Sequence, residues 1–405
     1  MKKRIKVFDT TLRDGEQSPG FSMHLEEKIR MALQLEKLNV EVIEAGFPIA
    51  SDGDYNAVKE ISKVIEKCIV AGLCRASVKD IDRAWEALQH AKMSRIHTFI
   101  ATSDLHLKYK LKKDRSEVLK DVEKAVKYSK SLCRDVEFSA EDASRSDRDF
   151  LVEVLNLAVE SGANVINIPD TVGYSLPEEF GKLVKYIYEN VKDIEKTDVS
   201  IHCHNDLGMA VANSYAGILN GANQVECTIN GIGERAGNAS LEEMVMLLKT
   251  RQQSIEYYTG INTKQLYPSS RLLTKITGID VQPNKAIVGK NAFAHEAGIH
   301  QDGVLKNPLT YEIITPQAVG KKSNNIVIGK HSGKHALSVE LKELGYILSK
   351  EKIEIAYNKI MAISDLKKSI KIDDLINAAE YAINRNQSFK GSYDYDINEQ
   401  TILTL

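Results

Sequence analysis

The stretch Val199-Ser-Ile-His-Cys-His-Asn-Asp206 joins a short apolar run to a group of polar side chains. Apolar residues recur at helical spacing on both sides of it, over 178–188 and over 209–219. A strand placed between two helices is typical of a parallel sheet, because parallel strands need a crossover connection. The stretch therefore predicts one strand–helix unit of an α/β fold, with polar residues at the end of the strand.

The same unit recurs through the first two-thirds of the chain. Eight units in about 250 residues match a (β/α)8 TIM barrel. An open, doubly wound sheet also alternates strands and helices, and it is the structural alternative. The eight predicted strands lie at 5–8, 42–44, 69–73, 96–100, 136–138, 165–168, 199–202 and 224–228.

The rhythm of strands and helices changes after residue 255. Prolines and glycines break the next segment into short pieces, and three helical stretches follow near 336–344, 351–364 and 372–384. We expect a catalytic barrel over 1–255, a linker subdomain over 256–335 and a small helical subdomain over 336–405.

Composition excludes several classes of protein. The 405 residues carry a net charge of −2, so no bulk basic field exists to hold nucleic acid or an anionic membrane. Mean hydropathy is −0.28, and no apolar run approaches the roughly 20 residues that span a bilayer. The basic N-terminus lacks the apolar region of a signal peptide, and the five cysteines form no C-x-x-C pair. A cytoplasmic enzyme is expected.

In a TIM barrel, catalytic residues lie at the C-terminal ends of the strands. Polar residues crowd that end of nearly every predicted strand, whereas the other ends are unremarkable. The polar segments are 9–17, 44–48, 101–103, 139–142, 169–171, 202–206 and 230–231.

His202 and His204 form the sharpest local signal. Residues i and i+2 of a strand point to the same face, so both imidazoles converge while Cys203 faces away. Two nitrogen donors suit a divalent metal completed by oxygen ligands, which Asp14 and Asn238 could supply from neighbouring loops. The alternatives are two polar side chains satisfied by hydrogen bonds, or a closed structural metal site.

Arg13 stands beside Asp14 at the end of the first strand. A surface ion pair would contribute little to stability. At this position the guanidinium could instead stabilise a developing oxyanion next to the metal.

Two further motifs are weaker. The segment 231–238, Gly-Ile-Gly-Glu-Arg-Ala-Gly-Asn, nearly fits the G-x-G-x-x-G/A dinucleotide fingerprint, but it follows the eighth strand rather than the first. His295 and His300 resemble a zincin motif with one residue too many, and five helical positions place them about 140° apart. We expect the segment around Gln301-Asp302-Gly303 to be a polar loop.

A run of cations at 108–115 is usually a solvated face, although it could attract the phosphates of a large anionic substrate. The five cysteines stand in no basic setting that would mark a nucleophile, so we interpret them as small core residues.

Several long motifs together resemble a known family. They are Asp9-Thr-Thr-Leu-Arg-Asp-Gly-Glu-Gln17, Glu44-Ala-Gly-Phe-Pro-Ile-Ala-Ser51, His202-Cys-His-Asn-Asp-Leu-Gly208, the segment 231–238 and the segment 289–303. The chain is similar to the DRE-TIM metallolyases, and among these to the Claisen-condensing acyltransferases of the 2-isopropylmalate synthase family. The resemblance covers about residues 5 to 390.

The resemblance implies roles for particular residues. Asp14, His202, His204 and Asn238 would bind a divalent metal (Mg, Mn or Zn), with a monovalent cation as a further activator. Arg13 would stabilise enolate or alkoxide charge, while Glu141 and His300 would form the acid–base pair, His300 reaching in from a partner chain. Residues that would line the keto-acid pocket or lie near the metal are Gln17, His97, Ser139 and Thr171.

The implied reaction condenses acetyl-CoA with 2-ketoisovalerate to give 2-isopropylmalate and CoA, the first committed step of leucine biosynthesis. Citramalate or homocitrate synthesis, from pyruvate or 2-ketoglutarate, is the alternative. The resemblance also implies a homodimer. Members of the family usually carry a further C-terminal domain that binds leucine, and we expect this chain to lack it.

Overall fold

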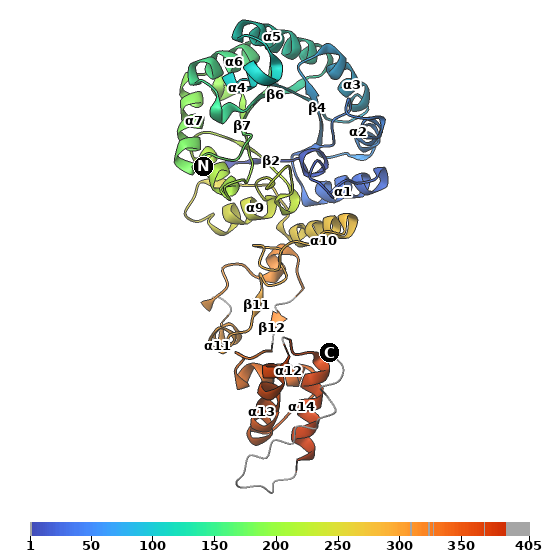
Figure 1. The fold of residues 1–405 in the computed structure, drawn as a ribbon, viewed down its shortest axis with the longest axis vertical. Helices are drawn as coiled ribbons and strands as arrows, with labels where there is room; N and C mark the ends of the chain where they lie inside the picture. The colour runs from blue at the N-terminus through green and yellow to red at the C-terminus, as the bar shows by residue number, and fades with distance from the viewer. Residues whose placement is uncertain (1, 308–309, 323–324, 327, 368, 386–405) are drawn as a thin grey trace. The chain divides into compact units, whose positions relative to one another are not determined.

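The computed structural model describes residues 2–307, 310–322, 325–326, 328–367 and 369–385. Eight parallel strands pair in chain order, and the last pairs with the first to close a barrel. Figure 1 shows this ring of strands surrounded by helices, which confirms the predicted TIM barrel. The strands are β2 (Lys6–Asp9), β3 (Val42–Glu44), β4 (Ile69–Arg75), β5 (Ser94–Ala101), β6 (Asp135–Glu141), β7 (Val165–Asp170), β8 (Asp198–Cys203) and β9 (Gln224–Cys227).

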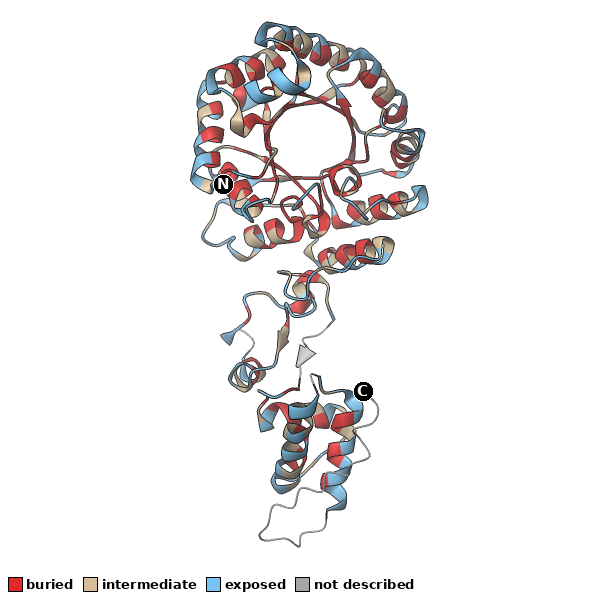
Figure 2. Ribbon diagram, viewed as in Figure 1, coloured by how far each residue is buried: buried red, intermediate tan, exposed pale blue. Residues whose placement is uncertain are grey.

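The helices around the barrel bury one face against the strands and expose the other, as Figure 2 shows. Helix α2 was not predicted individually, although Ser51 precedes it and its side chain accepts from the backbone N–H of Asp54, as an N-cap does. The helices of this part are α1 (Leu25–Leu38), α2 (Asp52–Val64), α3 (Val78–Leu88), α4 (Asp104–His106), α5 (Arg115–Leu132), α6 (Arg148–Glu160), α7 (Pro177–Asn190), α8 (Ala210–Leu219), α9 (Leu241–Thr250) and α10 (Leu266–Thr277).

Short elements complete the barrel. Strands β1 (Lys3–Arg4) and β10 (Tyr257–Tyr258) pair in parallel outside it. Two π-helical turns, η1 (Thr11–Gly15) and η2 (Leu107–Leu111), follow the first and fourth strands of the barrel. The single-turn 3₁₀ helices are η3 (Ala143–Arg145), η4 (Ile194–Lys196), η5 (Ile229–Gly231), η6 (Thr263–Gln265) and η8 (Pro316–Val319).

The interior of the barrel is rich in ionisable side chains. Arg95, on β5, donates to Glu137 over 2.9 Å and to Gln224 over 3.0 Å, and all three side chains are buried. Phe8, Val42 and Ala71 form a small apolar cluster beside them. Because the buried cation has carboxylate and amide partners, its desolvation is offset by charge-assisted hydrogen bonds.

The chain divides into two compact units. The first comprises Met1–Ala292 with Ile314–Ser323, and the second Phe293–Ile313 with Asn324–Leu405. The predicted division at residues 255 and 335 remains a prediction, and its last part, 386–405, lies outside the described residues. No helix among the described residues is long and apolar enough to cross a membrane.

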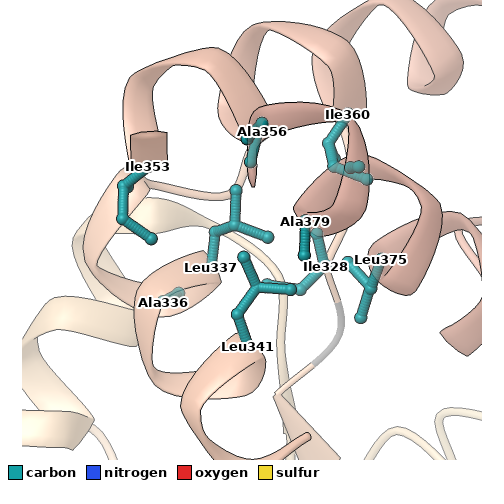
Figure 3. Packing of buried hydrophobic residues seen from close by; sticks show 11 residues of the cluster. Ile328, Ala336, Leu337, Leu341, Ile353, Ala356, Ile360, Leu375 and Ala379 are labelled. Atoms are coloured by element: carbon teal, nitrogen blue, oxygen red, sulfur yellow. The ribbon is translucent and has the colours of Figure 1, made fainter. Parts of the chain in front are cut away.

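The second unit is built around three helices, which confirms the helical stretches expected there. Their apolar side chains pack into one cluster that includes Leu337, Leu341, Ile360 and Leu375 (Figure 3). A short parallel pair of strands lies in the same unit. The elements are β11 (Ala294–His295), α11 (Gly298–Lys306), β12 (Asn325–Ile326), α12 (Lys334–Glu343), α13 (Lys350–Leu366) and α14 (Ile372–Asn384).

The polar loop expected around Gln301-Asp302-Gly303 is wrong, because α11 spans it. Gln301 and Val304 lie three residues apart and are both buried, so they form the inner face of this short helix. Gln301 donates to the carbonyl of His295 over 2.9 Å. His295 belongs to β11 and His300 to α11, so no single helix carries a zincin motif.

Candidate metal centre and active site

Three predicted metal ligands converge at the C-terminal end of the barrel. His202 lies in β8, His204 directly follows it, and Asp14 lies in η1 after the first strand. The Nε2 atoms of both histidines are 3.7 Å from Oδ2 of Asp14, and all three residues are buried. The prediction that spacing i, i+2 turns both imidazoles to one face is therefore confirmed.

These distances fit a shared cation better than a hydrogen-bonded cluster. A separation of 3.7 Å is too long for a hydrogen bond. Two ligands at about 2.1 Å from one ion are themselves roughly 3 to 3.5 Å apart. Asn238 joins the cluster, since its Nδ2 donates to Oδ1 of Asp14 over 3.0 Å, while its buried Oδ1 has no partner among the described residues. That unpaired oxygen suits a fourth ligand.

The electrostatics keep the predicted ligands in protonation states that can bind a metal. Burial lowers the pKa of His202 and of His204 to about 4, so both rings are neutral at pH 7. Burial alone would raise the pKa of Asp14, but Arg13 and the two histidines hold it well below its usual range. Two neutral imidazoles and one carboxylate are ligands that Mg, Mn and Zn all accept.

Arg13 is held beside the cluster by two carboxylates. Its Nη1 donates to Asp14 over 2.8 Å, and its Nε donates to Glu44 over 2.7 Å. Glu44 also contacts Nδ1 of His97 at 2.7 Å, and burial, which would raise its pKa, is overcome by Arg13 and His97, which lower it to about 2. The guanidinium is therefore fixed at the metal centre rather than free in solvent.

Glu44 is a residue that the sequence analysis did not assign to the site. It belongs to a chain of buried hydrogen bonds in which Nε2 of His97 lies 2.6 Å from Oγ of Ser139 and Asn167 donates to the same oxygen over 2.8 Å. His97 and Ser139, both predicted, are thus adjacent. The sequence signals for Glu44 were its position at the end of the second strand and its place as the first residue of the motif 44–51.

Glu226 was also missed. Its Oε2 lies 2.8 Å from Nδ1 of His202, on the side of the ring away from Asp14. Burial raises the pKa of Glu226 and of Glu137 to about 7. His97, Glu137 and Glu226 form a second group of potential metal ligands, but both nitrogens of His97 are already hydrogen-bonded, so it offers none to an ion.

Glu141 and Thr171 lie at the rim of the same end. Glu141 forms an ion pair with Lys110 of η2, with Oε1 2.6 Å from Nζ. Thr171 accepts a hydrogen bond from the backbone N–H of Asp142 over 3.0 Å, which ties the loops after β6 and β7 together. The cation run at 108–115 is therefore next to a predicted catalytic carboxylate.

Gln17 and His300 have less direct connections to the cluster. The backbone N–H of Gln17 donates to the carbonyl of Asp14 over 3.1 Å, and its exposed side chain lines a hollow together with Arg13. His300 is exposed on α11 of the second unit, where its ring centroid lies 4.2 Å from that of Tyr311. Its predicted role as a catalytic acid or base remains a prediction.

The glycine-rich segment 231–238 forms one wall of the metal centre. A Cβ on Gly233 would lie 2.2 Å from Nδ2 of Asn238 and 2.9 Å from Oδ1 of Asp14, so only glycine fits there. Arg235, at a φ of +55°, donates to both oxygens of Asp206 over 2.8 Å and ties the segment to the loop after β8. The near-match to a dinucleotide fingerprint thus has a different explanation, which is close approach to the metal ligands.

Comparison with known proteins identifies the family to which this architecture belongs. Residues 4–273 match the family model described as HMGL-like, and residues 287–368 match one described as homocitrate synthase post-HMGL domain-like. The 2-isopropylmalate synthase of Pelotomaculum thermopropionicum is 60% identical over 93% of this chain and 74% of its own length. That of Pyrococcus abyssi is 56% identical over 92% of this chain and 77% of its own.

Solved structures support the same fold. The hydroxymethylglutaryl-CoA lyase of Pseudomonas aeruginosa matches 72% of this chain and 97% of its own with a TM-score of 0.60, at 19% identity. An identity this low shows the barrel alone, whereas the curated relatives share more than half of their aligned residues over nearly all of the chain. The chain therefore belongs to the 2-isopropylmalate synthase family, with a barrel of the HMGL-like type.

Proposed function

We propose that this chain condenses acetyl-CoA with 2-ketoisovalerate, giving 2-isopropylmalate and CoA in leucine biosynthesis. Membership of the family gives the reaction, and the observation that carries it to this structure is the convergence of Asp14, His202 and His204 beside Arg13. These three residues and Asn238 would hold a divalent metal, which would supply Lewis-acid polarisation of the keto oxygen when bound.

The surrounding side chains perform the remaining chemistry. A carboxylate or imidazole, Glu141 or His300, removes a proton from the acetyl methyl group, and the resulting carbanion forms a carbon–carbon bond with the keto carbon. Arg13, held by Glu44, stabilises the negative charge that develops on oxygen before that oxygen is protonated. Water then cleaves the thioester and releases CoA with a new carboxylate.

The keto acid lies against His97, Ser139 and Thr171 in this proposal. His97 and Ser139 are buried and face each other at 2.6 Å, so they present fixed polar groups to a small substrate. Gln17 lies near the metal. We further propose that the protein works in the cytoplasm as a homodimer, with His300 supplied by the partner chain, and that a monovalent cation activates it.

Exposed lysines in the cation run 108–115 could attract acetyl-CoA through its phosphates. Lys108 and Lys112 have no acidic partner among the described residues, whereas Lys110, Lys113 and Arg115 are paired. We propose that the two unpaired cations attract the phosphates of the coenzyme. Replacing both Lys108 and Lys112 with Ala should raise KM for acetyl-CoA about fivefold at low salt, while KM for the keto acid stays unchanged. The control replaces Lys182 and Lys185 on α7 with Ala.

The test of function follows CoA release with a thiol reagent. 2-Ketoisovalerate, pyruvate and 2-ketoglutarate are offered separately, before and after a chelator, and activity is restored with Mg²⁺, Mn²⁺ or Zn²⁺ in turn. Chelator-sensitive release that prefers 2-ketoisovalerate supports the proposal. Preference for another keto acid would reassign the substrate, and release that is unaffected by chelation would exclude the metal-dependent mechanism.

A further inference from the structure

Glu226 projects into the barrel from β9, directly beside His202 on β8. The two residues are register partners in the parallel pair, so their side chains lie side by side on the inner face of the sheet. Glu226 is 1% exposed, and its Oε2 is 2.8 Å from Nδ1 of His202. Burying a carboxylate is costly unless it is hydrogen-bonded or paired, and His202 is such a partner for Glu226.

This hydrogen bond determines which nitrogen of His202 is available. A ring whose Nδ1 donates a proton to a carboxylate presents the lone pair of Nε2 at its other edge. In His202 that Nε2 is the atom 3.7 Å from Oδ2 of Asp14. The contact with Glu226 lies where a hydrogen bond donated by Nδ1–H would fix both the tautomer and the direction of the ring.

The second histidine offers a contrast within the same site. His204 is as deeply buried, but its Nδ1 has no hydrogen-bond partner among the described residues. Only His202 is held from behind by a carboxylate. The two ligands therefore differ in how firmly the protein orients them.

We propose that Glu226 is a positioning residue for the metal centre, holding the His202 ring so that Nε2 points at the site shared with Asp14 and His204. The inference rests on the proposed metal site, because an oriented lone pair matters only when it meets a cation. Partners of this kind typically change metal affinity by about 10- to 100-fold when they are removed. Glu226 lies behind the ring, so it acts through His202.

The test measures Mn²⁺ affinity by electron paramagnetic resonance of the free ion, without substrates. Glu226→Leu, which removes the acceptor, should raise the Mn²⁺ Kd about 100-fold, and Glu226→Gln, which keeps an acceptor oxygen but loses the charge, about 10-fold. Glu137→Gln is the matched control, because Glu137 is an equally buried barrel carboxylate whose hydrogen bonds go to Arg95 and Gln224. It should change the Kd less than either Glu226 variant does, because its hydrogen bonds go to Arg95 and Gln224 rather than to a predicted ligand.

Equal losses in the Glu137 and Glu226 variants, or no loss in either, would overturn the proposal, as would a wild-type protein that does not bind Mn²⁺. If the Glu226 variants do not fold, ¹⁵N chemical shifts of His202 in the wild-type protein, identified by their loss in His202→Asn, decide the matter. A ring protonated at Nδ1 supports the proposal, and one protonated at Nε2 refutes it. Intact Mn²⁺ binding without CoA release would count against the proposed reaction alone.

Discussion

The two units of the chain bury very different interiors. The helices of the second unit enclose only isoleucine, leucine and alanine in the cluster of Figure 3. The barrel encloses apolar residues between strands and helices, but inside the ring of strands it holds Arg95, Glu137, His97, Glu44 and Glu226. An apolar cluster gains stability from area removed from water, whereas buried charges are useful mainly for chemistry.

The barrel tolerates these charges because its geometry pairs them. Parallel register places inward side chains of adjacent strands next to each other, as it does for Glu226 with His202 and for Ser139 with Asn167. Each ionised group thereby finds a partner within hydrogen-bond distance. Substitutions in the barrel interior should therefore affect metal binding and turnover, while substitutions in the helical cluster should affect stability alone.

The largest effect is expected at Asp14. Asp14→Ala removes the only carboxylate among the predicted metal ligands, so the rate of CoA release should fall by at least about 10³-fold, or about 4 kcal/mol of transition-state stabilisation. Asp198→Ala is the control, since Asp198 pairs with Lys6 at the other end of the barrel. Comparable rates for the two variants would remove Asp14 from the metal centre.

Leu341→Ala tests the expectation that the apolar cluster of the second unit affects stability alone. Leu341 is fully buried in the helical cluster, so its truncation should lower the unfolding free energy of the second unit by about 3 kcal/mol. Urea denaturation followed by circular dichroism should shift, while fluorescence of Trp85, the only tryptophan, which lies in α3 of the barrel, should not.

Leu366→Ala is the matched control for this variant, because Leu366 is 82% exposed in α13 of the same unit. Mn²⁺ affinity should be unchanged in both. A loss of metal affinity in Leu341→Ala alone would show that the apolar cluster supports the metal centre. That result would contradict the expectation that substitutions in this cluster affect stability alone.

Gly233→Ala should act on the barrel without changing any charge. The added Cβ would meet Nδ2 of Asn238 at 2.2 Å and push a ligand from its place, and displacements of about 1 Å cost roughly 10²-fold in rate. CoA release and Mn²⁺ affinity are the measurements. Gly53→Ala in α2 is the control, because its Cβ would find its nearest atom at 3.5 Å; similar losses in both would reject a steric cause.

The smallest effect is expected at Asp374, which caps α14. Its carboxylate accepts from the backbone N–H of Lys371 over 2.9 Å and pairs with Lys367, contacts that lower its pKa. Asp374→Ala should lower the unfolding free energy of the second unit by about 1 kcal/mol at pH 7.

The pH dependence of this difference has a definite sign. A carboxylate with a lowered folded-state pKa stabilises the fold above its unfolded pKa of about 3.9, and the contribution disappears as pH falls through the folded value. The deficit of Asp374→Ala relative to wild type should therefore shrink below about pH 4. Asp373→Ala, at an exposed carboxylate in the same turn, should show a smaller deficit, and a pH-independent deficit at Asp374 would contradict the assignment.

Much of the barrel was predictable because its signals are local. The predicted strand 42–44 has the same bounds as β3 in the structure, and the two-residue period of a strand predicted that His202 and His204 lie together. Asp14 required one further step, since the seventh, eighth and first strands are neighbours only when the barrel closes. Local periodicity and barrel topology were sufficient for these ligands.

Other parts of the site depend on contacts that local patterns do not encode. Glu44 and Glu226 lie within short strands, where the sequence does not distinguish a charge facing the interior from one facing a helix. The helix α11 was missed because its polar residues and two glycines mask a buried face formed by only Gln301 and Val304. The predicted role of His300 requires a partner chain, about which the residues next to it in the sequence carry no information.

Closure of the barrel has a consequence for how the protein matures. Asp14 and Asn238 are hydrogen-bonded across 224 residues of sequence, and the β2–β9 pairing that joins the two ends of the ring brings them together. A nascent chain whose eighth strand has not yet been synthesised cannot assemble the complete set of predicted ligands. Metal retention during synthesis would therefore report the moment at which the ring closes, and a chain stalled before that point would release its ion to any competing chelator.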